Sequence, residues 1–204
     1  MGEEIRSLPM AAEFRVRDND DGSVTVVGHP AKFDKWSDVM MGFREKVAPG
    51  AFARTLGEGA DVRALWNHDP NYVLGRTTSG TLRLSEDKDG LYMELDAPNT
   101  PTIRDLVIEP MRRGDVTQMS FGFRVRKDEW IQGKDKSPDE RTLLDVDLFD
   151  VSPVTYPAYP DTDVAVRSAQ YRAWKTEIED FETERKRVQA IELNRLDALD
   201  ELYS

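Results

Sequence analysis

Residues 116–126 read VTQMSFGFRVR, and this stretch decides the fold. Its side chains alternate between two sets: Met119, Phe121, Phe123 and Val125 are apolar, and Ser120, Gly122, Arg124 and Arg126 are small or polar. Successive side chains of a strand point to opposite faces, so the alternation predicts a strand with one face on the core. Ser120 is expected on the opposite face, and the glycine beside it is expected to leave open space above the hydroxyl.

Further strands are predicted on both sides of this stretch. Short alternating runs occur at residues 13–17, 23–28, 62–67, 81–84, 91–96 and 142–151. Turn sequences follow several of them: DDG at 20–22, TSG at 78–80 and KDG at 88–90. The spacing of these runs and turns favours a mostly antiparallel sheet or barrel.

Residues 128–140 are rich in charge and predict a mobile surface loop.

Helices are fewer. One is predicted over residues 101–113, with Thr100 as N-cap, Pro101 at the first helical position and Gly114 just past the end. Pro110 is expected to loosen or kink its last turn. A short helix is predicted over residues 51–56. Together these elements predict an α+β fold, a mostly antiparallel β-barrel core with a few flanking helices.

The composition changes after residue 160, since Gly133 is the last glycine and Pro160 the last proline. From residue 169 the apolar side chains follow a spacing of three and four: Trp174, Ile178, Phe181 and Val188. This spacing predicts a long amphipathic helix. We therefore predict a globular domain over residues 1–168 and a charged helical arm over residues 169–204. The arm could bind a partner, associate with itself or pack on the domain.

The composition excludes several function classes. With 28 basic and 39 acidic residues the net charge is −11, which argues against nucleic acid as the main partner. The absence of cysteine excludes disulfides, thiolate metal sites and a cysteine nucleophile. With only His29 and His68, a multi-histidine metal centre is not available, so no metal and no cofactor are predicted. No membrane-spanning apolar run and no secretory signal are evident, which predicts a soluble intracellular protein.

Three residues, His68, Ser120 and Asp150, are candidates for chemistry, and two of them, His68 and Ser120, are more simply structural when each is taken alone. His68 lies in DVRALWNHDP, on the strand face of Val62, Ala64 and Trp66, at a turn attributed to Pro70. His29, before a proline, is still more simply structural. Ser120 has no hydrolase elbow around it, because Gln118 stands where that motif has glycine.

The third candidate is Asp150, in the run RTLLDVDLFDVSPVTYPAYP at residues 141–160. Asp150 continues the apolar face of Leu144, Val146 and Leu148, whereas Asp147 points to the other face. A buried carboxylate needs a hydrogen-bond partner, and a histidine N–H would serve. A cap on the turn before the next proline is an equally open reading.

Taken in order, these runs are far more specific than any one of them. The ordered set is GHPAKFD at 28–34, FREKVAPGAFARTL at 43–56, WNHDPNYVLGRT at 66–77, RRGDVTQMSFGFRV at 112–125 and LFDVSPVTYPAYPDT at 148–162. From about residue 12 to 168 the chain resembles the prohead maturation serine proteases of tailed bacteriophages, which are distantly similar to the herpesvirus assemblins. The resemblance implies an assemblin-like fold for this part of the chain.

The resemblance also implies the site. It makes Ser120 the nucleophile and His68 the general base of a serine endopeptidase that works through an acyl-enzyme. Asp150 is the third member, but relatives commonly carry glutamate there, so Asp147 stays open. The backbone N–H groups near Gly122, or the Arg124 side chain, are candidate oxyanion donors.

The implied partners are the scaffold protein and the capsid protein or its scaffolding segment, cleaved inside the assembling procapsid in the host cytoplasm. Self-cleavage is implied as well, and association of the chain with itself stays open. The alternative is a catalytically inactive capsid-binding or scaffold-binding assembly module with the same fold. A hydrolase of small esters or amides is disfavoured by the missing elbow.

Overall fold

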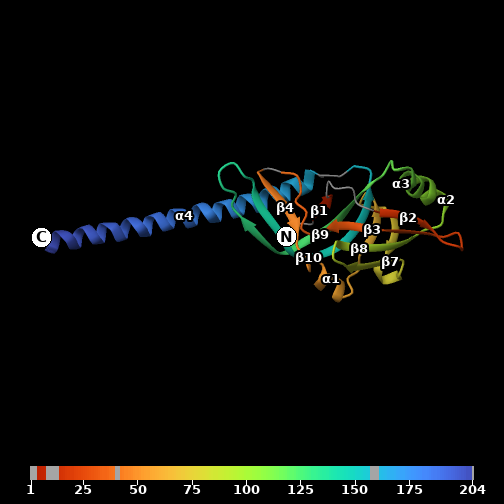
Figure 1. Ribbon diagram of the computed structural model, residues 1–204, viewed down its shortest axis with the longest axis horizontal. Coiled ribbons are helices and arrows are strands. Elements are labelled where there is room, and N and C mark those ends of the chain that lie inside the picture. The colour runs from red at the N-terminus through yellow and green to blue at the C-terminus, as the bar shows by residue number, and fades with distance from the viewer. Residues whose placement is uncertain (1–3, 8–13, 40–41, 157–160, 204) are drawn as a thin grey trace. The chain divides into compact units, whose positions relative to one another are not determined.

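The computed structural model describes residues 4–7, 14–39, 42–156 and 161–203 (Figure 1). The chain divides into two compact units, residues 1–163 and 164–204. The first unit is built mostly of strands with few helices, and the second is helical. The chain is therefore a mixed α+β protein.

The larger sheet carries the stretch from which the sequence analysis began. It has six strands in the order β1-β9-β10-β5-β6, and β4 also pairs with β10. Their bounds are β1 (Glu4–Ser7), β4 (Phe43–Val47), β5 (Arg63–Trp66), β6 (Asp69–Arg76), β9 (Gln118–Ile131) and β10 (Asp139–Val154). Strands β4 and β5 run parallel to β10, and the other pairs are antiparallel.

The smaller sheet has four antiparallel strands in the order β2-β3-β8-β7. Their bounds are β2 (Phe14–Asp18), β3 (Val24–Lys32), β7 (Leu82–Glu86) and β8 (Gly90–Ala97). Among the described strands the two sheets are open and separate, apart from one isolated bridge between Phe33 and Val47. The prediction of a closed barrel is wrong at this point, because alternation shows which face of a strand is buried but not which strand edges meet.

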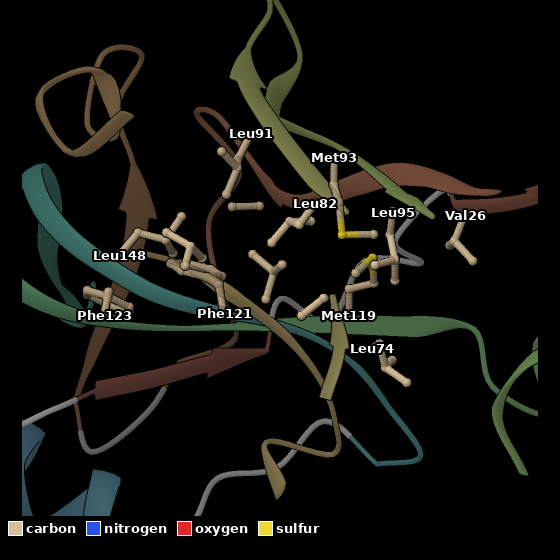
Figure 2. Packing of buried hydrophobic residues seen from close by; sticks show 14 of the residues in the cluster. Val26, Leu74, Leu82, Leu91, Met93, Leu95, Met119, Phe121, Phe123 and Leu148 are labelled. Atoms are coloured by element: carbon tan, nitrogen blue, oxygen red, sulfur yellow. The ribbon is translucent and has the colours of Figure 1, made fainter. Parts of the chain in front are cut away.

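The core lies where buried side chains of the two sheets meet, as Figure 2 shows for β7, β8, β9 and β10. Phe121 and Phe123 stack with ring centroids 5.0 Å apart, and Phe52 contacts Phe121 edge to face at 5.7 Å. Burying a side chain of this size stabilises the fold by about 1.5–3 kcal/mol. The apolar half of the 116–126 pattern therefore does form the core, as its alternation predicts.

The predicted helix at 101–113 is present but irregular. It consists of α2 (Pro101–Ile103), a π-helical turn (Arg104–Ile108) and α3 (Glu109–Arg113). The Thr100 hydroxyl accepts a hydrogen bond from the Ile103 N–H, and Gly114 ends the helix with φ +78°. Pro110 has no N–H to donate to the preceding turn, and the wider π turn ends at Ile108, just ahead of it. The short helix predicted at 51–56 is α1 (Ala53–Gly57).

Strands β9 and β10 form a long hairpin whose connection, residues 132–138, is shorter than the predicted loop at 128–140. The extra strand residues include a buried charge cluster. The guanidinium of Arg141 donates from Nη1 to Glu45 at 3.0 Å and from Nε to Asp128 at 2.7 Å. Arg141 and Glu45 are both buried. Because charged side chains lie inside the sheet here, the pattern of apolar residues does not predict strand β4 or the ends of β9 and β10 next to their connection.

Helix α4 spans Asp161–Tyr203. Its first residues, up to Asp163, belong to the first unit, and the rest of the helix forms the second. It begins before the predicted boundary at residue 169. Phe181, Val188 and Ile191 are more than half exposed. In the part of the chain that the structure describes, no helix is long and apolar enough to span a bilayer.

Candidate active site

His68 lies in a two-residue turn that joins β5 to β6, between the paired residues Trp66 and Asp69. Asn67 and His68 have φ values of +53° and +59°. Two successive left-handed residues define the hairpin turn whose twist matches that of its strands. For histidine this conformation is uncommon, and such strain concentrates at functional sites. The alternation of side chains between two faces therefore does not extend from Trp66 to His68, because the chain leaves the strand after Trp66. Pro70 does not form the turn either, since it lies beyond it, in β6.

Asp150 is turned by an irregularity in the β9–β10 ladder. Leu148 pairs with Phe123 and Asp150 pairs with Gly122, so Phe149 is an extra residue on β10. Directly opposed residues point to the same face of a sheet, and a bulge redirects the side chains that follow it. Asp150 therefore lies on the face of Ser120 and not on the apolar face of Leu148. The prediction that it continues the apolar face is wrong for this reason.

The three candidates from the sequence meet in one hydrogen-bonded series. His68 Nδ1 lies 2.5 Å from Asp150 Oδ1, and His68 Nε2 lies 2.6 Å from Ser120 Oγ. An ionised carboxylate only accepts hydrogen bonds, so the Nδ1–H donates to Asp150 and Nε2 accepts from the Ser120 hydroxyl. The His68 side chain is 10% exposed and that of Asp150 is 7% exposed.

Gly122 accommodates this acid and does not leave open space above the serine. A Cβ at position 122 would stand 2.0 Å from Asp150 Oδ2 and 2.6 Å from Phe149 Cε2. Ser120 itself has no exposed surface. The expected open polar face is therefore wrong, since the acid fills the space beside the glycine.

Asp147, the alternative third member, is held elsewhere. Arg54 donates from Nη2 to its Oδ1 at 2.6 Å, and Arg126 donates from Nε to its Oδ2 at 2.5 Å. Burial raises the pKa of Asp147, but the hydrogen bonds from the two guanidinium groups outweigh burial and lower that pKa below its usual range. The structure thus brings Asp150, and not Asp147, to His68.

Two further residues support the site and were missed from the sequence. Ser152 donates from Oγ to Asp150 Oδ1 at 2.8 Å. Asn67 donates its backbone N–H to the Pro153 carbonyl at 3.1 Å and accepts from the Thr155 N–H at 2.8 Å. These bonds tie the histidine turn to the end of β10. The sequence did offer signals for both residues: a serine two positions after Asp150, and an asparagine directly before His68.

The second histidine belongs to a different place. His29 lies in strand β3 and not in a turn, and its Nε2 lies 2.9 Å from Asp87 Oδ2. Among the described residues, His29, Asp87 and Asp89 bring possible metal-ligand atoms within 4.8 Å of one another. Asp89 is already paired with Lys88. None of these residues is part of the Ser120 series.

A hydroxyl bonded to an imidazole that is itself held by a carboxylate is the arrangement that activates a serine for attack on a carbonyl. The imidazole can take the hydroxyl proton, and the carboxylate stabilises the resulting positive charge. The arrangement is recognised by this geometry and these roles, because it recurs on unrelated folds.

Comparison with known proteins points to the same class. No curated protein sequence matches the chain. Among solved structures, the capsid assembly protease gp21 of bacteriophage T4 is similar, with a TM-score of 0.50 and 8% sequence identity over 74% of this chain and 98% of that chain. At that identity the likeness shows the fold alone. The model of the caudovirus prohead serine proteases matches residues 11–177, so the chain belongs to this serine peptidase family, as the order of its sequence blocks predicts.

Proposed function

We propose that this capsid maturation protease uses Ser120 as nucleophile, His68 as general base and Asp150 as the acid that orients the histidine. The observation that carries the proposal is the unbroken hydrogen-bonded series from Ser120 Oγ through both ring nitrogens to Asp150 Oδ1. Its members come from β9, from the β5–β6 turn and from β10. Such a meeting of distant residues suits a catalytic role better than a structural one.

In this mechanism Ser120 Oγ attacks the carbonyl carbon of a peptide while His68 Nε2 takes its proton. The imidazolium then donates that proton to the leaving amine, and the acyl-enzyme is hydrolysed by water with His68 again as base. Asp150 holds the ring in the required tautomer, and Ser152 steadies the carboxylate. The backbone N–H groups near Gly122, or Arg124, are the proposed donors to the oxyanion.

The proposed substrates are the scaffold protein and the capsid protein or its scaffolding segment, cleaved within the procapsid in the host cell, followed by cleavage of the protease itself. Membership of the prohead protease family supports this choice. Confinement inside a shell raises the local concentration of both partners, so modest affinity suffices.

We further propose that the chain functions as a protease domain of residues 1–168 and an arm of residues 169–204 that places the enzyme among capsid or scaffold subunits. The exposed Phe181, Val188 and Ile191 support a docking role for α4. Association with a second copy through the same side chains is the other reading of this arm.

The test combines labelling and processing. A fluorophosphonate probe should label Ser120 of the intact chain, located by peptide mass spectrometry, and the Ser120→Ala chain should not be labelled. Incubation with the capsid precursor should then yield defined fragments in the mass spectrum. An unlabelled, well-folded chain that still binds capsid protein would favour the inactive assembly module instead.

A further inference from the structure

The strand that carries Ser120 has one edge filled by the chain's own N-terminal segment. β10 pairs with one edge of β9, and β1 pairs antiparallel with the other, with Glu4 opposite Phe123 and Ser7 opposite Ser120. Among the described strands only β1 lies on that edge. In Figure 1 β1 is a short arrow beside β9.

An unpaired strand edge is a ready binding site for an extended peptide. It presents a row of backbone N–H and C=O groups that pair with any chain in extended conformation, largely independently of its side chains. A peptidase must hold its substrate in this conformation beside the nucleophile. The edge of β9 over Ser120–Phe123 offers such a row, and it leads directly to the nucleophile.

The Ser120 hydroxyl is hydrogen-bonded to His68, as a nucleophile requires, but Ser120 has no exposed surface. A serine that attacks a protein substrate must meet a peptide carbonyl, so part of the chain must move away from Ser120 before the substrate can bind. β1 is four residues long and lies at the end of a sheet. Short terminal edge strands open at low free-energy cost, which makes β1 the element best suited to leave.

We propose that the edge of β9 over Ser120–Phe123 is the docking strand for the extended backbone of the protein substrate, and that β1 is its intramolecular competitor. The antiparallel register gives the direction: the substrate runs from Phe123 toward Ser120, with its scissile carbonyl at the Ser120 end. The inference rests on the proposed function of Ser120. A site open for only part of the time has an apparent affinity reduced by that fraction.

Occupancy can be tested without activity, because the natural chain has no cysteine. Residues 7 and 120 are directly paired in the β1–β9 ladder, so the Ser7→Cys/Ser120→Cys chain should form one intramolecular disulfide, read as a mass loss after mild oxidation. The matched control is Ser7→Cys/Ser152→Cys. Ser152 pairs with Ser120 from the other side, one strand further away, about 10 Å from β1 and too far for a disulfide.

Competition is tested by Ile5→Pro in the otherwise natural chain, since proline removes a backbone N–H and disrupts strand pairing. The value of kcat/KM for the capsid precursor should rise several-fold with kcat unchanged, and Ile5→Val should leave both values as they are. A synthetic peptide of residues 1–10 should inhibit the Ile5→Pro chain, and a scrambled peptide should not.

Equal cross-linking in the two cysteine pairs would overturn the inference. So would a kcat/KM that stays the same or falls in Ile5→Pro, or a loss of cooperative unfolding in that chain, because β1 would then be an integral strand. Failure of fluorophosphonate to label Ser120 even in the Ile5→Pro chain, while the disulfide still forms in the Ser7→Cys/Ser120→Cys chain, would refute the proposed function and leave the placement of β1 intact.

Discussion

Asp150 and Gly122 are directly opposed in the β9–β10 ladder, and the Asp150 carboxylate occupies the space that a side chain at position 122 would need. The contact is so close that a Cβ at 122 would stand 2.0 Å from Oδ2. The carboxylate that holds His68 is thus positioned by the absence of a side chain on the neighbouring strand.

Gly122→Ala should displace the Asp150 carboxylate and lower kcat/KM for the capsid precursor by about 10²-fold, because a shift near 1 Å in a catalytic group has this effect. Gly57→Ala is the matched control, since a Cβ there meets nothing within 4 Å. The measurement is initial cleavage rate at low substrate concentration. Full activity in Gly122→Ala would show that the position of the carboxylate is not critical.

Ser120→Ala and His68→Ala should each lower cleavage of the capsid precursor by about 10⁴-fold or more, because the members of such a series act as a unit. Both chains should keep the far-UV circular dichroism of the natural protein. His29→Ala, in the other histidine site, should retain activity. Full cleavage by either the Ser120 or the His68 variant would refute the assignment.

Asp150→Asn should reduce kcat by about 10²–10⁴-fold, since an amide at this place favours the wrong tautomer of the histidine. Asp147→Asn should have little effect on kcat, because its carboxylate is bound by Arg54 and Arg126 and not by His68. Steady-state kinetics of both variants decide the matter. The reverse order of effects would move the third member to Asp147.

Arg141→Ala should destabilise the fold by about 3–5 kcal/mol, because the buried Glu45 carboxylate loses its ion pair with the Arg141 guanidinium. Arg83→Ala, which breaks a pair with Asp96 near 46% exposure of both side chains, should cost about 1 kcal/mol or less. Urea denaturation at neutral pH measures both differences. Equal small effects would mean that the Arg141 cluster contributes little.

Deletion of residues 169–204 should leave turnover of a short peptide nearly unchanged but reduce incorporation into procapsids, because the exposed apolar side chains of α4 suit a partner. Turnover is measured first at equal enzyme concentrations, then co-sedimentation with assembling capsid protein. An unfolded truncated chain would make α4 an integral part of the domain. A loss of turnover that appears only on dilution would indicate that the arm dimerises.

Local sequence determined much of this protein. The alternation in 116–126 defines the core side of β9, and Thr100, Pro101 and Gly114 mark the ends of the helical segment. These features depend on residues that are neighbours in the chain, so they can be read without the fold. The ordered sequence blocks around His68 and Ser120 predicted the family, and the comparison with family models confirmed it.

Only the tertiary structure decided how these pieces meet. The bulge at Phe149 turns Asp150 toward Ser120, and no periodic pattern within β10 predicts an extra residue that exists only relative to β9. The apolar pattern does not predict strand β4, because its buried Glu45 is paired with Arg141, which lies 96 residues away in the chain. The open sheets and the pairing of β1 with β9 depend in the same way on partners distant in sequence. Pairing, register and edge occupancy are properties of two strands at once, whereas the sequence of one strand determines only its own faces.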